Sequence, residues 1–126
     1  MEQEKYKTKT VILVDDNQES GETRVALFEL EGIFAIHYRR GDKFLGEIKE
    51  GIRYDLLIVD RSFPENQGLD GDDIARFSKR VNPSCPVFAL SGHPVKNIPY
   101  YFDDYFVKGK MDPGVLIEAV KKRLNS

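Results

Sequence analysis

Residues 54–60 read YDLLIVD, and this stretch decides the fold class. Leu56 to Val59 are four consecutive apolar residues, a pattern typical of a strand that is buried on both faces of a parallel sheet. Asp60 follows at once. The stretch therefore predicts a central strand that ends at an aspartate.

A second strand of the same kind lies upstream, at residues 10–14 (TVILV), and it ends at Asp15 and Asp16. From these two strands outward, apolar runs alternate with amphipathic stretches along the whole chain. The elements expected in chain order are a strand at 10–14, a helix at about 17–31, a strand at 33–38, a helix at about 42–51 with Asp42 as its N-cap, a strand at 54–60, a helix at 72–81, strands at 86–91 and around 105–107, and a last helix that Asp112 caps and Pro113 begins.

This alternation predicts a doubly wound α/β domain with a five-stranded parallel sheet in the order 2-1-3-4-5. In the first helix, Val25 to Phe28 and Leu30 form the band expected to face the sheet. The interval from Ser91 to Asp103 is short and contains two prolines. We therefore expect a shortened or irregular fourth helix.

Length and composition predict one domain and exclude several classes of protein. With 126 residues, 40% of them hydrophobic, the chain suffices for one core and is too short for two ordinary domains. We expect one domain over residues 1–126, with its core at about 10–124. A net charge of -2 without a basic block disfavours nucleic-acid binding. A lone cysteine, no signal-peptide pattern and no membrane-length apolar run favour a cytoplasmic protein without membrane contact.

Polar residues follow the strands at their carboxyl ends, which meet at one edge of a parallel sheet. They are Asp15, Asp16, Asp60, Ser91 and Lys108. Three carboxylates beside one lysine leave an excess of negative charge, which a hard divalent cation such as Mg²⁺ would compensate. Asp60 is then placed to attack a phosphoryl group, while Ser91 and Lys108 neutralise charge on the transferred oxygens.

These residues resemble the receiver domains of two-component response regulators, of the single-domain, chemotaxis-regulator type. The resemblance runs from Thr10 to near Leu124, and its four features occur in the family's order. They are Asp15-Asp16 after the first strand, Asp60 after the third, Ser91-Gly92 after the fourth and Lys108 after the fifth. The resemblance implies a flavodoxin-like fold and a role in phosphorelay signal transduction.

The resemblance also implies how each residue works. Asp60 would accept a phosphoryl group from a sensor histidine kinase or a phosphotransfer protein, and the product would switch contacts with an unknown downstream protein. Asp15, Asp16, Asp60 and the main-chain carbonyl of Ser62 would hold Mg²⁺. Ser91 and Tyr105 would be the switch residues. Such a protein is a phosphoacceptor with slow self-dephosphorylation rather than an enzyme of many turnovers.

The sequence departs from the family pattern at the loop beyond Asp60, at the short interval before Lys108, and at Gly109, where the family commonly has proline. The irregular segment from Pro94 to Asp103 motivates a second reading, a pseudo-receiver that binds partners without being phosphorylated, although the intact acidic site argues against it. A phosphohydrolase is the third reading. Such enzymes usually carry a second aspartate two residues after the nucleophile, where this chain has Ser62.

Overall fold

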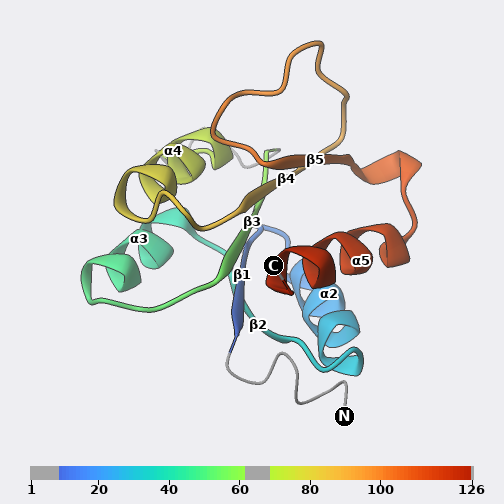
Figure 1. The fold of residues 1–126 in the computed structure, drawn as a ribbon, viewed down its shortest axis with the longest axis horizontal. Coiled ribbons are helices and arrows are strands. Elements are labelled where there is room, and N and C mark those ends of the chain that lie inside the picture. Colours follow the sequence, from blue (N-terminus) through green and yellow to red (C-terminus); the bar gives the residue numbers. More distant parts are fainter. Residues whose placement is uncertain (1–8, 62–68, 126) are drawn as a thin grey trace.

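The computed structural model describes residues 9–61 and 69–125, and it confirms the doubly wound α/β architecture (Figure 1). Five parallel strands form one sheet in the order β2-β1-β3-β4-β5. The strands are β1 (Thr10–Val14), β2 (Phe34–Tyr38), β3 (Leu56–Asp60), β4 (Val87–Ser91) and β5 (Asp104–Val107). The helices are α2 (Gln18–Leu30), α3 (Gly41–Lys49), α4 (Gly71–Val81), the short 3-10 helix η2 (Lys108–Lys110) and α5 (Pro113–Leu124).

Helices cover both faces of the sheet, with α2 and α5 on one face and α3 and α4 on the other (Figure 1). Successive strand residues point to opposite faces. In β3, Leu56 and Ile58 therefore pack towards α2 and α5, while Leu57 and Val59 pack towards α3 and α4. All four side chains are fully buried. Burial on both faces explains why the central strands are uniformly apolar in sequence.

Side-chain caps fix the start of three helices. Asn17 caps α2 by accepting a hydrogen bond from the Ser20 N–H, and Asp112 caps α5 with Pro113 in its first turn. Asp70 and Asp73 form a reciprocal capping box at α4. Acceptors at these positions satisfy N–H groups that have no partner inside the helix.

Two details of the predicted helices are wrong. Arg40, not Asp42, precedes α3, because the chain is already helical at Gly41; Asp42 lies in the first turn and forms an ion pair with Arg40. In α2, the predicted inward band is confirmed at Phe28, which is buried, and at Val25, which packs against the core, but it is wrong at Ala26, which is exposed, and at Leu30, which is 75% exposed. The fully buried residues of α2 are Gly21 and Phe28, about two helical turns apart, so its inner face runs along the helix instead of gathering near its end.

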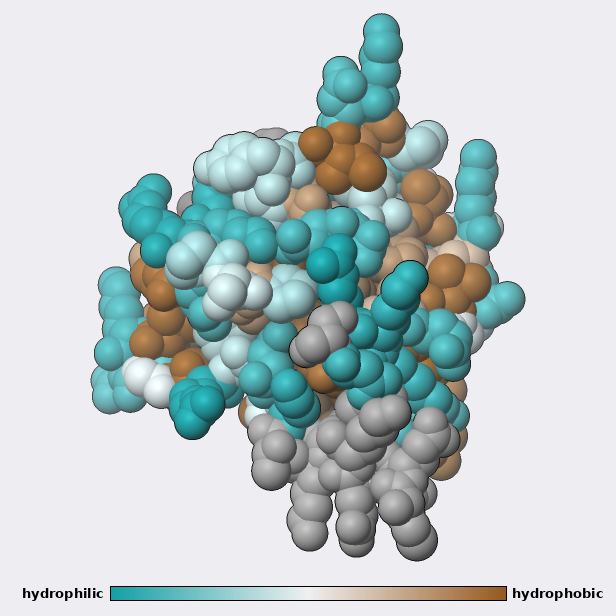
Figure 2. Space-filling view, in the orientation of Figure 1, coloured by the Kyte–Doolittle hydropathy of each residue, from teal (hydrophilic) through white to brown (hydrophobic). Residues whose placement is uncertain are grey.

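The segment 92–103 between β4 and β5 contains no helix, which confirms the predicted irregularity. Asp103 anchors its end, since its carboxylate accepts hydrogen bonds from the Val87 N–H (2.8 Å) and from Lys79 Nζ (2.7 Å). Tyr101 and Phe102 are buried against the α3 and α4 side of the core. The middle of the segment is exposed, and hydrophobic side chains are visible at this end of the molecule in Figure 2.

Within the described part of the chain, no helix has both the length and the apolar character needed to span a bilayer.

Candidate functional site

Three carboxylates meet at the carboxyl edge of the sheet. Strands β1 and β3 are neighbours with Val14 opposite Val59, so the residues that end them lie side by side. Asp15, Asp16 and Asp60 each offer an oxygen, and these three oxygens lie within 4.8 Å of one another. Asp15 is fully buried and Asp60 is 3% exposed. The structure therefore brings together the three aspartates that the sequence singled out.

Two cations approach this cluster, Lys108 at Asp60 and Arg24 at Asp15. Lys108, on η2 directly after β5, places its Nζ 2.7 Å from Asp60 Oδ2. Arg24, on the inner face of α2, places Nη1 3.2 Å from Asp15 Oδ2. The sequence pointed to Lys108 but not to Arg24. The only signal for Arg24 was its spacing, one turn after Gly21 and one turn before Phe28 on the buried face.

The two cations do not fully compensate the negative charge of the three carboxylates. Burial raises the pKa of the Asp15 carboxyl; the Asn17 N–H, which donates to Oδ1 at 2.9 Å, opposes this, and the charge of Asp60 raises the pKa further. Arg24 and Lys108 lower it but leave the net pKa above its ordinary value. The site therefore has room for one more positive charge. A few hard carboxylate oxygens are the donor set that Mg²⁺ uses, so the residues fit this ion.

Close backbone packing holds the aspartates in place. His37 on β2 donates from Nε2 to the main-chain oxygen of Asp15 at 2.7 Å, and its ring lies against Gly21. A Cβ at Gly21 would lie 2.1 Å from that ring, and a Cβ at Gly71 would lie 2.8 Å from the main-chain oxygen of Asp60. Both glycines let a helix approach the site closely. Nothing in the sequence connects His37 with the site.

The two expected switch residues share one acceptor. Ser91 is buried at the end of β4, and its Oγ donates to the His93 carbonyl at 3.0 Å. Tyr105 on β5 donates its hydroxyl to the same carbonyl, also at 3.0 Å. The Ser91 hydroxyl is therefore engaged with the 92–103 segment. Ser62, whose main-chain carbonyl was predicted as a metal ligand, lies outside the described residues.

Arg61 connects the site to the 92–103 segment, a role that the sequence did not reveal. Its guanidinium donates two hydrogen bonds to Asp72, from Nε at 2.8 Å and from Nη2 at 2.9 Å. Nη1 donates to the Tyr105 hydroxyl at 3.0 Å. The same guanidinium lies 5.6 Å from the ring centres of Phe102 and Tyr105. Burial alone would raise the pKa of Asp72, but hydrogen bonds from Arg61 and Tyr101 lower it overall.

Comparison with known proteins supports the architecture. No family model matches the chain. A cyclic di-GMP phosphodiesterase of Thermotoga maritima is 28% identical over 116 residues, which are 92% of this chain but only 27% of that protein. The chain thus spans about a quarter of the length of this curated relative.

Solved receiver domains superpose on nearly the whole chain. A CheY-like receiver domain protein from Methanospirillum hungatei has a TM-score of 0.80 at 20% identity, covering 93% of this chain and 94% of that one. The response regulator TrrA from Thermotoga maritima, in complex with Mg²⁺ and BeF, has a TM-score of 0.80 at 24% identity, covering 92% and 99%. A Francisella receiver domain gives 0.80 at 24%, covering 94% and 98%. This chain therefore has the fold of response-regulator receiver domains.

Proposed function

We propose that this chain is a response-regulator receiver that accepts a phosphoryl group on Asp60 from a histidine kinase or a phosphotransfer protein. The observation that carries the proposal is the surroundings of Asp60. Its carboxylate is almost fully buried, lies within reach of two further carboxylates, and is paired with Lys108 at 2.7 Å. Such a carboxylate is held in one orientation next to a cation, as an attacking nucleophile requires.

In the proposed reaction, one oxygen of Asp60 attacks the phosphorus of the donor. The bond from phosphorus to the donor nitrogen breaks, the donor imidazole keeps the electron pair and takes a proton, and an acyl phosphate forms on Asp60. Asp15, Asp16 and Asp60, with the main-chain carbonyl of Ser62, would hold Mg²⁺, which when bound neutralises charge on the transferred oxygens. Lys108, whose Nζ lies 2.7 Å from Asp60 Oδ2, contributes a second positive charge beside this carboxylate.

Later attack by water on phosphorus would return Asp60 to its free form, which makes the chain a slow self-resetting switch. The added phosphoryl group carries a charge of roughly -1.5 to -2. Ser91 would leave the His93 carbonyl to donate to a phosphoryl oxygen. Since Tyr105 donates to the same carbonyl, its hydrogen bond would change as well. The 92–103 segment is therefore the proposed surface for a downstream protein.

Mass spectrometry after incubation with acetyl phosphate and Mg²⁺ tests this function. The wild type should gain one hydroxylamine-labile phosphoryl group, and both Asp60→Asn and chelation by EDTA should abolish the gain. Asp55→Asn is the matched control: Asp55 lies at the opposite end of β3 and accepts a hydrogen bond from the Thr10 N–H. Labelling of this control should equal that of the wild type. A wild type that is never labelled would instead favour the pseudo-receiver reading, and labelling that survives in Asp60→Asn would refute the assignment of Asp60.

A further inference from the structure

Arg24 is paired with one of the three carboxylates that are proposed to hold the metal ion. Its Nη1 lies 3.2 Å from Asp15 Oδ2, while Oδ1 of the same carboxylate accepts the Asn17 N–H at 2.9 Å. Both oxygens of Asp15 are therefore engaged. The pair is shielded from solvent, with the Arg24 side chain 20% exposed and the Asp15 side chain 1% exposed. A shielded ion pair of this kind is screened far less by salt and water than a surface pair.

The charges of the site show what Arg24 changes. Lys108 alone would leave three carboxylates against one cation, which is a strong attraction for a divalent ion. With Arg24 added, two cations face three carboxylates, and most of the excess negative charge is already compensated within the chain. A metal ion that binds Asp15 must displace Arg24 or accept its repulsion at short range.

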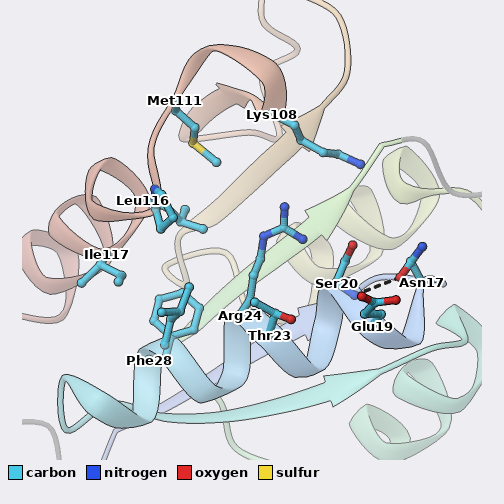
Figure 3. A pocket seen from close by; sticks show the side chains of 12 residues that line it. Asn17, Glu19, Ser20, Thr23, Arg24, Phe28, Lys108, Met111, Leu116 and Ile117 are labelled. Carbon is cyan, nitrogen blue, oxygen red and sulfur yellow. Dashed lines mark hydrogen bonds between the residues drawn. The ribbon is translucent and has the colours of Figure 1, made fainter.

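The chain provides a place for the displaced side chain. A cavity of about 390 Å³ opens between α2 and the start of α5. Its walls include Arg24 and Lys108, the hydroxyl-bearing residues Ser20 and Thr23, and an apolar floor. Figure 3 shows Arg24 rising from α2 into this space, with its head on the same side as Lys108. The guanidinium can therefore leave Asp15 without entering the packed core.

We propose that Arg24 is a built-in counter-ion that competes with the divalent cation for Asp15 and so sets the Mg²⁺ concentration at which the site fills. Arg24 is a positioning residue in this scheme, because it acts through Asp15. The inference rests on the proposed metal site, but it concerns affinity for the ion and not the transfer of a phosphoryl group.

The test is an NMR titration of the phosphate-free protein with Mg²⁺, following amide shifts of the residues after β1 and β3. Arg24→Gln removes the charge and keeps a long polar side chain, and it should bind Mg²⁺ roughly five- to tenfold more tightly than the wild type. Arg24→Lys keeps the charge and should remain within about twofold of the wild type. A merely structural role would not separate these two variants.

Arg80→Gln is the matched control for net charge. Arg80 is exposed near the end of α4, and helices that follow strands end at the opposite edge of the sheet from the site. The affinity of the Arg80→Gln variant for Mg²⁺ should equal that of the wild type. Equal affinities in wild type and Arg24→Gln would overturn the inference and leave the phosphoacceptor function standing. An equal gain in Arg80→Gln would also overturn it, because long-range charge would then be the cause. If no variant binds Mg²⁺, both this inference and the proposed metal site fail.

Discussion

Replacing Arg61 by alanine should destabilise the protein by about 2–3 kcal/mol. The change removes two hydrogen bonds to Asp72, one to Tyr105, and the stacking of a cation against two aromatic rings. Hydrogen bonds to charged groups contribute about 1.5–3 kcal/mol each, and such stacking about 0.5–1. The ion pair is partly solvent-screened, with 24% and 20% of its side chains exposed, so the sum is reduced. Asp72 keeps one donor, Tyr101.

Urea unfolding followed by circular dichroism measures this change, and the midpoint of thermal unfolding should fall by about 10 °C. Arg40→Ala is the matched control. Arg40 forms a similar bidentate ion pair with Asp42, with both hydrogen bonds at 3.0 Å, but its side chain is 59% exposed. That substitution should leave stability unchanged. Arg61→Lys should recover less than half of the lost stability, since an ammonium group cannot form the bidentate pair of hydrogen bonds with Asp72. Equal stabilities for the Arg61→Ala and Arg40→Ala variants would refute the view that Arg61 fastens the 92–103 segment.

Two further predictions concern buried titratable groups. The folded-state pKa of Asp15 is raised, chiefly by burial, so the metal-free protein loses stability as pH rises through that pKa. Asp15→Asn should therefore be more stable than wild type in EDTA at pH 7 but not near pH 3. Urea unfolding at both values checks this, and a less stable variant at pH 7 would contradict it. Burial also raises the pKa of the Cys85 thiol to about 12. Iodoacetamide at pH 8 should therefore label the native protein roughly a thousandfold more slowly than an unfolded control. Fast labelling of the native protein would show that Cys85 is exposed.

The sheet and the acidic cluster were predictable because each depends on local sequence. The strands are buried on both faces, so each is an unbroken apolar run, and the residue that ends a strand is fixed by where the run stops. Parallel pairing then brings Asp15 and Asp60 together without further information. The cap at Asp112 was predictable for the same reason, because a capping side chain contacts backbone only three residues away.

Arg24, Arg61 and His37 were not predictable, because their roles depend on contacts between distant elements. An arginine on an amphipathic helix is normally solvated, and only the packing of α2 on the sheet turns Arg24 towards Asp15. Arg61 pairs with a residue 11 positions away and with another 44 positions away. His37 reaches the main chain of a residue 22 positions earlier. No periodicity in the sequence encodes such distances.

The proposed coupling of the site to a partner would pass through the 92–103 segment, which contains no helix. A helix would have satisfied its backbone N–H and C=O groups with internal hydrogen bonds and would have moved as a rigid unit. Here Ser91 and Tyr105 both donate to the His93 carbonyl, and Asp103 fixes the far end of the segment through Val87. A hydroxyl that leaves His93 to meet a phosphoryl oxygen gives up a bond inside the segment itself. In the proposed phosphorylated state, the segment would lose the Ser91 bond at its start while the Asp103 contacts at its end remain, so we expect the largest change between these two points. Arg61 also donates a hydrogen bond to the Tyr105 hydroxyl, so we expect Arg61→Ala to increase the response of the 92–103 segment to a phosphoryl mimic such as beryllium fluoride.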